Sequence, residues 1–176
     1  TIEKGDIIQK RIQNVDNVIK STPLIKSLNG SVLSSEEKIS LLVYAYDSYG
    51  AETSLQVLEG ENPQNDYEAA VSKNVLERLD KKIGDMITLN VDGKDSTFLV
   101  TGSFQVMSNG GQAVRITKGA YKMLNPNADY NWFAVNIKEG ADAEVVKAAL
   151  QKAVGGQMSV SIMTEFIDNI VGAIVK

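Results

Sequence analysis

The 176-residue sequence predicts an α+β fold, in which an α/β layer built from both ends of the chain carries a small inserted β-rich subdomain. Three observations support this class. Helical and strand periodicities alternate along the chain, both ends carry apolar stripes at helical spacing, and the middle contains short alternating runs separated by turn dipeptides. We expect residues 1–47 plus 128–176 to form the discontinuous α/β subdomain, and residues 48–127 to form the insertion with one short helix.

The most regular stretch runs from residue 68 to residue 111. It begins with a short strand, after which Ser72 is a suitable N-cap for a helix whose apolar positions are Val75, Leu76, Leu79 and Ile83. Lys81 and Lys82 fall in the expected last turn, where the helix dipole favours cations. Gly84 tolerates a left-handed conformation, so we expect the helix to end there.

A β-hairpin is predicted directly after this helix. Apolar and polar residues alternate from Ile87 to Val91, and the dipeptide Asp92-Gly93 between two alternating runs is a strong hairpin signal. Gly102 continues the apolar register of the returning strand, which predicts a bulge or a close approach of another backbone there.

The remaining elements follow from the same periodicities. An extended segment after the first helix carries Asn29-Gly30, a second hairpin-type dipeptide. We expect helices at residues 2–14, 117–124 and 141–154 and from Thr164 onward, and strands at residues 39–46, 113–116, 131–137 and 158–162.

The composition excludes several classes of function. The apolar fraction of 43% and the charged fraction of 23% are typical of a globular protein. A net charge of -4 argues against nucleic-acid binding, which needs a concentrated basic surface. The chain has neither Cys nor His, so it lacks thiolate nucleophiles and the commonest ligand for zinc, copper or iron. We expect no metal site and no cofactor.

Membrane-spanning segments are not expected within this chain, because no window holds the roughly 18 uninterrupted apolar residues that a spanning helix needs. The chain begins with Thr1 rather than Met. We therefore expect a processed or excised fragment of a longer protein.

Short motifs with a catalytic interpretation are few. Residues 35–38 match Ser-x-x-Lys, but neither Ser-Asp-Asn nor Lys-Thr-Gly accompanies them, so we interpret them as a turn or cap. The carboxylate pairs Asp66/Glu68 and Asp92/Asp95 have the chemistry for cation binding or acid–base catalysis, but turn polarity accounts for them. We therefore expect that the protein is not an enzyme.

Aromatic residues gather in two runs, Tyr44, Tyr46 and Tyr49 in one and Trp132 and Phe133 in the other. Core packing is the default interpretation, and an outward-facing partner-binding patch is the alternative.

The loop at residues 108–112 contains Asn109, Gly110 and Gly111. Its two glycines make it the best candidate for a mobile tip and partner loop, but a plain hairpin turn is the favoured interpretation.

The stretch from residue 68 to residue 104 resembles the extracytoplasmic core domain of MacB/FtsX-like ABC transporter permeases. That family has a Glu-x-x-x-Ser strand, a Leu-rich helix, a Lys-x-Gly-Asp-x-Ile turn and a hairpin that ends in Phe-x-Val-x-Gly, here at residues 68–72, 73–79, 82–87 and 98–102. The likeness extends more loosely over nearly the whole chain. The resemblance implies a porter-like α/β subdomain and a structural motif made of Ser72, Gly84, Asp85, Asp92, Gly93 and Gly102.

The resemblance also implies a function. Such a domain lies on the extracytoplasmic face of the cell membrane, in a permease that pairs with a cytoplasmic ABC ATPase subunit and usually dimerises. It does not hydrolyse ATP. It receives motion through flanking transmembrane helices and handles an unknown extracytoplasmic substrate or protein partner.

Both terminal helices are candidates for a stalk that continues the transmembrane helices, through Ile8 and Ile12 in the first and Phe166, Ile170 and Ile174 in the last. Ordinary amphipathic core helices have the same spacing and are the alternative. Two other functions stay open as alternatives, a free-standing extracellular ligand- or peptide-binding module and, less favoured, a hydrolase with clustered carboxylates.

Overall fold

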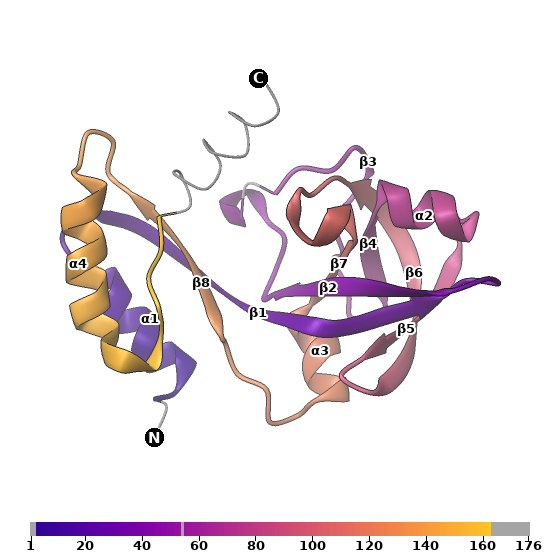
Figure 1. The fold of residues 1–176 in the computed structure, drawn as a ribbon, viewed down its shortest axis with the longest axis horizontal. Coiled ribbons are helices and arrows are strands. Elements are labelled where there is room, and N and C mark those ends of the chain that lie inside the picture. Colours follow the sequence, from indigo (N-terminus) through magenta and orange to yellow (C-terminus); the bar gives the residue numbers. More distant parts are fainter. Residues whose placement is uncertain (1–2, 54, 163–176) are drawn as a thin grey trace. The chain divides into compact units, whose positions relative to one another are not determined.

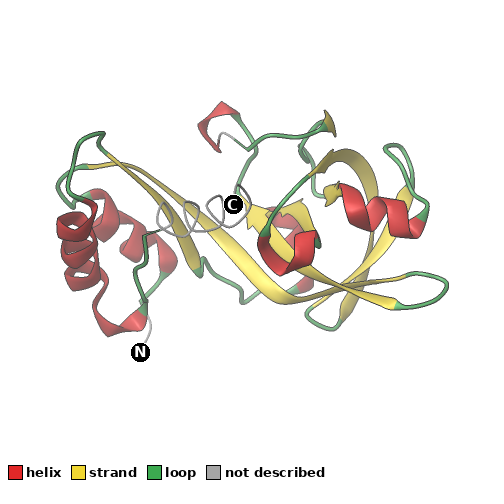
Figure 2. Ribbon diagram, turned by 45° about the horizontal axis from the view of Figure 1, so that its top comes forward, coloured by secondary structure: helices red, strands yellow, loops and turns green. Residues whose placement is uncertain are grey.

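The computed structural model describes residues 3–53 and 55–162, and the chain divides into two units. One unit comprises Thr1–Thr22 and Phe133–Lys176, and the other comprises Pro23–Trp132. Eight strands and four α-helices are present in the described residues, which confirms the predicted α+β class (Figures 1 and 2). The predicted helix from Thr164 onward, with Phe166, Ile170 and Ile174, lies outside the described residues.

The unit Pro23–Trp132 is built on a ring of six strands. These strands are β1 (Val18–Leu33), β2 (Lys38–Tyr46), β4 (Glu68–Ser72), β5 (Met86–Val91), β6 (Lys94–Phe104) and β7 (Ala113–Thr117). Their pairing order is β2-β7-β4-β6-β5-β1, and β1 pairs again with β2, so the sheet closes on itself. Closure removes exposed sheet edges along the paired length of the strands. A short strand, β3 (Glu59–Gly60), pairs with β6 from outside the ring.

The ring closes at residues 30–32 of β1, which pair with strands on both sides. Gly30 lies opposite Leu41 of β2 and Val91 of β5. A Cβ atom on Gly30 would lie 2.8 Å from the carbonyl oxygen of Leu41, so the close approach of β2 requires glycine here. The hairpin expected at Asn29-Gly30 is therefore wrong. These residues form an irregularity within β1, and the turn to β2 is at residues 34–37.

The ring interior is apolar and is closed by two helices. The inward-facing positions predicted on β5 are buried, and so are Val43 and Val114 on the neighbouring strands. Helix α2 (Lys73–Leu79) contributes Val75 and Leu76, and helix α3 (Lys118–Leu124) contributes Ala120 and Tyr121. Figure 1 shows α2 above the strands of the ring and α3 below them.

Helix α2 is shorter than the sequence predicts. It ends at Leu79, and Asp80 takes the left-handed C-cap conformation with φ 53°. Gly84 instead has φ +96° in the following turn, and Ile83 is exposed rather than part of the buried face. Asp tolerates the left-handed region because its short polar side chain bonds locally, which allows the helix to end four residues early.

The Asp92-Gly93 hairpin is present and joins β5 to β6, with Val91 opposite Lys94. Both turn residues have positive φ, 51° and 87°, as the two-residue turn that fits strand twist requires. Further along β6 the register with β4 shifts between Val100 and Gly102, which is a bulge that turns the rest of the strand to the other face.

In the described part of the other unit, two helices pack against the first residues of β1 and most of a further strand. Helix α1 (Gly5–Gln13) and helix α4 (Ala143–Val154) lie side by side (Figure 1), and strand β8 (Trp132–Ile137) pairs with β1. The helices share a buried cluster made of Ile8, Ile12, Val146, Leu150 and Val154. Asp142 caps α4 by accepting the N–H groups of Glu144 and Val145.

The strand expected at residues 158–162 is not formed. The side chain of Gln151 instead bonds this segment, because its amide nitrogen donates to the Met158 carbonyl at 2.9 Å and its amide oxygen accepts the Val160 N–H at 3.1 Å. Met158 and Val160 pack on the helical cluster. A side chain from α4 thus satisfies backbone groups that a sheet partner would otherwise have to satisfy.

The division between the units falls at residues 22/23 and 132/133, so residues 23–47 and 128–132 belong to the unit with the ring. The predicted subdomain boundaries at 47/48 and 127/128 stay a prediction. No helix in the described residues is long and apolar enough to cross a membrane.

Candidate functional site

The predicted motif residues lie in the strands and turns of the ring, and they do not converge on a reactive centre. Across residues 3–53 and 55–162, no three acidic side chains are arranged to hold a metal ion. Each motif residue instead has a packing or hydrogen-bonding partner, or a backbone conformation, that accounts for it. These residues therefore have structural roles.

Ser72 is at the N-cap position of α2, but its side chain makes no capping hydrogen bond. Its buried hydroxyl oxygen accepts the backbone N–H of Ala113 at 3.1 Å. The serine therefore joins β4 to the start of β7. By contrast, Thr117 does cap α3, since its hydroxyl oxygen accepts the N–H of Ala120.

Gly102 lies where another segment approaches the sheet. A Cβ atom there would lie 2.3 Å from the carbonyl oxygen of Glu61, which follows β3. Nearby, Asp85 closes the turn after α2 by accepting the N–H of Lys82 at 2.9 Å. Gly84 and Gly93 both have positive φ in turns with open space around them.

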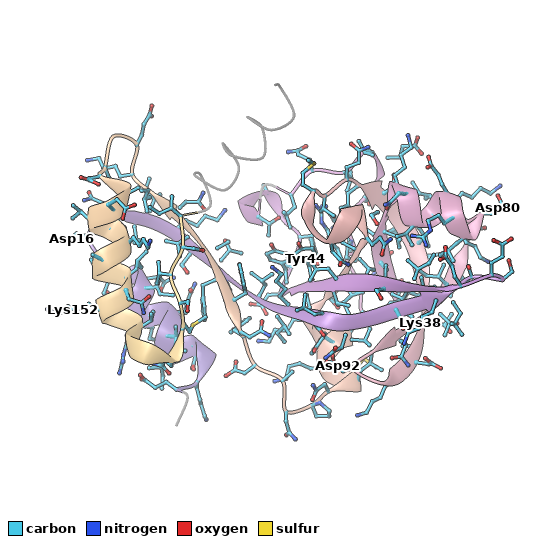
Figure 3. The ribbon with its side chains drawn as sticks, viewed as in Figure 1. Asp16, Lys38, Tyr44, Asp80, Asp92 and Lys152 are labelled. Carbon is cyan, nitrogen blue, oxygen red and sulfur yellow. The ribbon has the colours of Figure 1, made fainter. Side chains whose placement is uncertain are left out.

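Asp92, labelled in Figure 3, links the hairpin turn to two other parts of the unit. One carboxylate oxygen accepts the hydroxyl of Ser27 at 2.7 Å, and the other accepts the hydroxyl of Tyr121 on α3. Burial, together with this hydrogen bond to a carboxylate, raises the pKa of Tyr121 to about 12. The aspartate therefore fixes the hairpin to α3 rather than acting with Asp95, which accepts from Asn90.

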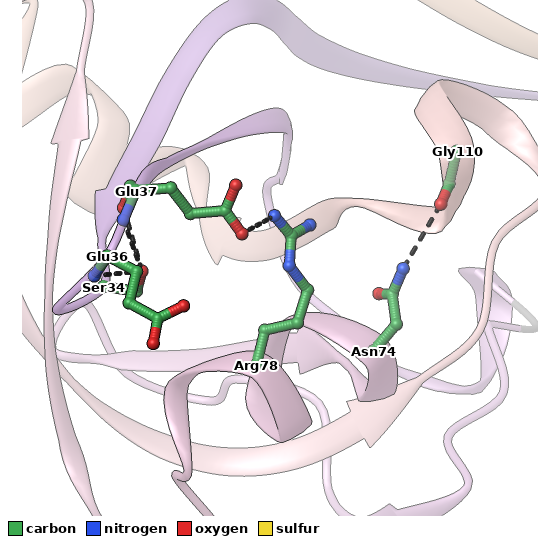
Figure 4. A network of polar contacts seen from close by, with 6 residues as sticks. All are labelled: Ser34, Glu36, Glu37, Asn74, Arg78 and Gly110. Atoms are coloured by element: carbon green, nitrogen blue, oxygen red, sulfur yellow. Dashed lines mark hydrogen bonds and ion pairs between the residues drawn. The ribbon is translucent and has the colours of Figure 1, made fainter.

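A polar network joins three segments at one end of the ring (Figure 4). Arg78 on α2 forms an ion pair with Glu37 of the β1–β2 turn. Asn74 on the same helix donates to the carbonyl of Gly110 in the loop Ser108–Gly111. These contacts attach both the predicted partner loop and the turn that carries the Ser-x-x-Lys sequence to α2. We call the turn, α2 and the loop together the tip network.

The Ser-x-x-Lys motif and the carboxylate pair Asp66/Glu68 both have structural roles. In the turn, the hydroxyl of Ser34, not Ser35, donates to the Glu37 carbonyl and accepts two N–H groups. In the other pair, Asp66 accepts the hydroxyl of Thr117, while Glu68 accepts N–H groups of the preceding loop. Turn and cap roles thus account for all these groups.

Arg115 on β7 is the main buried cation of the described residues, and sequence reasoning missed it. Its guanidinium carbon lies 3.9 Å from the ring centroid of Phe104, and its Nη1 donates to the Gln56 carbonyl and to Asn62 Oδ1. It thereby holds the segment between β2 and β4 over the outer face of the sheet. The only sequence signal was a charged residue inside an apolar run.

The first aromatic run surrounds this arginine. Tyr46 and Tyr49 contact edge to face with their centroids 5.3 Å apart. Tyr49 is buried, and its hydroxyl donates to the Ile116 carbonyl at 2.7 Å. Burial is also the main reason that the pKa of Tyr49 lies well above its usual value. Core packing therefore accounts for Tyr49, while Tyr44 and Tyr46 are half-buried.

Two lysines contact aromatic rings at the half-buried margin of the same unit. Lys26 Nζ lies 3.9 Å from the Trp132 centroid, and Lys118 Nζ lies 3.8 Å from the Tyr130 centroid. Burial alone would lower the pKa of Lys118, but the hydrogen bond to Tyr130 and the charge of Asp47 raise it above its usual value. Such contacts are worth about 0.5–1 kcal/mol at exposed sites. Phe133, by contrast, packs on the helical cluster of the other unit.

Comparisons with known proteins agree with this architecture. Residues 1–153 match the family described as MacB-like periplasmic core domain. The fold is similar to the extracellular domain of the noncanonic ABC-type transporter YknZ from Gram-positive bacteria (TM-score 0.59, 18% identity, 84% of this chain and 78% of that chain). It is also similar to the periplasmic region of MacB from Actinobacillus actinomycetemcomitans (TM-score 0.58, 12% identity, 86% and 73% of the two chains).

A third solved structure, a domain of a putative permease protein from Porphyromonas gingivalis, has a TM-score of 0.52 at 12% identity and covers 83% of this chain and 69% of that chain. Comparison with curated protein sequences finds no match. At these identities the solved structures establish the fold.

Proposed function

Because the chain belongs to the family of MacB-like periplasmic core domains, we propose that it is a non-catalytic domain that couples cytoplasmic ATP hydrolysis to substrate or partner handling outside the membrane. In this proposal the flanking transmembrane helices transmit the motion. The partners are a cytoplasmic ABC ATPase subunit, a second copy of the permease and an extracytoplasmic substrate or protein.

The packing of α1 is the observation that carries this proposal. Ile8 and Ile12 are buried against α4, where they contact Val146 and Leu150 among others. Burying two isoleucine side chains stabilises the contact by roughly 3–6 kcal/mol. A displacement of α1 would therefore move α4 with it. This is the mechanical property that a stalk helix needs.

The proposal can be tested with a spin label on α4 in the full-length permease with its ATPase. This chain has no cysteine, so Val145→Cys places one label on the exposed surface of the domain once any cysteines elsewhere in the permease and its ATPase are replaced. We expect the label-to-label distance in the dimer to differ between the nucleotide-free and vanadate-trapped states. Identical distance distributions in both states, or a strictly monomeric permease, would refute the coupling role.

Two α1 variants in the labelled background test transmission through the helix. Ile12→Ala removes buried contacts with α4, and we expect it to reduce the nucleotide-dependent change in distance. Ile7→Ala is the matched control, because Ile7 is an exposed isoleucine on the same helix. Equal effects of the two variants would show that α1 packing does not transmit the motion.

We also propose that the loop Ser108–Gly111 meets the extracytoplasmic partner. Asn109 and Gly110 are exposed and have positive φ, and Asn74 holds the loop through its bond to Gly110. Gly110→Lys should abolish complementation of a permease deletion without loss of folding. Gly140→Lys is the control, because Gly140 also has positive φ and open space. Full complementation by Gly110→Lys would exclude this loop.

A further inference from the structure

The ring of strands is open at one place, where β1 and β5 separate. The two strands pair only at three positions, from Gly30 opposite Val91 to Val32 opposite Leu89. Strand β5 nevertheless continues to Met86 and stays paired with β6 over its whole length. Residues 86–88 are thus paired with β6 on one side and, in the described residues, form no ladder pair on the other, where Thr88 lies opposite Leu33, the last residue of β1.

The backbone groups at this opening point toward the missing neighbour. The N–H of Asp92 donates to the Asn29 carbonyl on β1 at 3.0 Å. In an antiparallel ladder, alternate residues direct their N–H and C=O groups to the same side. Thr88 and Met86, four and six residues before Asp92, thus direct theirs toward β1, beyond the last paired residue.

A groove lies at this opening. It has a volume of about 560 Å³ and is lined by Leu33, Lys38, Leu79, Lys81, Met86 and Thr88 among others. Leu33 and Met86 are 75% and 50% exposed, which gives the groove two large apolar side chains that are open to solvent. Unpaired strand backbone beside exposed apolar side chains is the arrangement to which an extended peptide adds as a further strand.

The charges of the groove indicate the kind of peptide. Lys38, labelled in Figure 3, and Lys81 are both exposed, and neither forms an ion pair within the described residues. Asp95 also lines the groove and keeps its negative charge while it accepts a hydrogen bond from Asn90, so the two lysines of the lining outnumber its one carboxylate. Two unpaired cations beside an apolar surface complement a segment in which acidic and apolar residues alternate.

We propose that this groove binds an extended, acidic segment of a protein partner by β-strand addition to the Met86–Thr88 edge of β5. Main-chain hydrogen bonds to Met86 and Thr88 hold the segment. Its apolar side chains contact Leu33 and Met86, and its carboxylates pair with Lys38 and Lys81. The binding does not depend on the coupling role, so each can fail without the other.

The test uses the 176-residue chain and the acetylated, amidated peptide Thr-Val-Glu-Val-Glu-Val-Thr as the probe. In the free chain, the amides of Met86 and Thr88 should exchange hydrogen faster than those of Ile87 and Leu89, which face β6. Saturating peptide should slow exchange at Met86 and Thr88 and shift their NMR resonances. The same peptide with Lys in place of Glu should bind at least about tenfold more weakly.

Charge-reversal variants locate the site. The double variant Lys38→Glu, Lys81→Glu should bind the acidic peptide at least about tenfold more weakly. Lys122→Glu with Lys138→Glu makes the same change in net charge at exposed lysines outside the groove lining and should leave binding unchanged. A peptide N-methylated at its central valine should bind poorly, because it loses a main-chain donor.

Three outcomes would overturn the proposal. One is slow exchange at Met86 and Thr88 in the free chain, which would mean that the edge is already satisfied. Another is acidic peptide binding that shifts resonances elsewhere or is unaffected by the groove variants. The third is concentration-dependent dimerisation of the chain that protects the same amides, which would make a second copy the occupant.

Discussion

The guanidinium group of Arg115 stacks over the ring of Phe104, with 3.9 Å between the guanidinium carbon and the ring centroid. Both side chains are buried on the outer face of the sheet. Burial lowers the pKa of Arg115, although the group still carries a charge at neutral pH because arginine pKa values are so high. One side chain thus combines a ring contact with the two hydrogen bonds that hold the covering segment.

We expect Arg115→Lys to lower the free energy of unfolding by about 1–3 kcal/mol. A lysine ammonium cannot keep both the planar ring contact and the two directed hydrogen bonds. Urea denaturation followed by circular dichroism measures the loss. Arg11→Lys is the control, since Arg11 forms an exposed ion pair with Glu3 and its replacement should cost below about 1 kcal/mol. Equal losses in the two variants would contradict this account.

Three glycine-to-alanine variants separate steric contact from backbone strain. Gly102→Ala places a Cβ against the Glu61 carbonyl and should cost about 2–3 kcal/mol. In Gly93→Ala the added Cβ contacts no atoms, but the residue has φ +87°, so we expect a loss of about 1–2 kcal/mol in the free energy of unfolding. Gly156→Ala has open space and no positive φ, so its effect should stay within about 0.5 kcal/mol. Thermal or urea unfolding should give this order, and any other order counts against the contact at Gly102.

Ser72→Ala tests whether the serine acts as a cap or as a strand connector. It leaves the buried Ala113 N–H without its acceptor, so we expect a loss of about 1–3 kcal/mol and faster hydrogen exchange at Ala113. Thr117→Ala removes a true cap and should cost about 1 kcal/mol, with faster exchange at Ala120. If Ser72→Ala changed exchange only in α2, the capping role predicted from sequence would be correct.

Tyr121 makes the free energy of unfolding depend on pH in the alkaline range. Its pKa is about 12 in the folded protein, above the usual value near 10 that we take for the unfolded chain. Between these two values the folded state binds more protons than the unfolded state, so the free energy of unfolding falls as the pH rises. The contribution is fully present below pH 10 and is lost as the pH passes about 12.

We therefore expect Tyr121→Phe to flatten the fall in stability between pH 10 and pH 12, measured by urea denaturation at fixed pH values. Part of the fall in stability should persist in this variant, because the pKa of Tyr49 is also raised. Tyr67→Phe, which removes the hydroxyl of an exposed tyrosine, is the control. If Tyr121→Phe left the slope of the free energy of unfolding against pH unchanged, the raised pKa of Tyr121 would be contradicted.

Local periodicity predicted the elements that depend on local interactions. The Asp92-Gly93 turn and the amphipathic helix α4 are present because their conformations follow from residues close in the sequence. The α2 region shows the limit of this reasoning. Ile83 continues the helical spacing of Val75 and Leu76 by coincidence, while Asp80 ends the helix in a conformation that a helical pattern does not reveal.

Local periodicity in the sequence could not predict features that depend on long-range contacts. Asn29-Gly30 has the composition of a turn, yet neighbouring strands on both sides keep it within β1. Ser72 is in a capping position, yet its hydroxyl serves an N–H that is 41 residues away. The groove also depends on where β1 and β5 part, which involves segments more than 50 residues apart. Arg115 and the tip network depend on the same kind of contact.

The double pairing of β1 has a consequence for how the ring bears load. Residues 30–32 bond to β2 on one side and to β5 on the other, while the first residues of the same strand belong to the unit that contains α1. Tension along β1 would act parallel to the strand and therefore across its perpendicular hydrogen bonds. Those bonds would share the shear and break together rather than one by one. The seam that closes the ring thus lies on a strand whose first residues belong to the other unit.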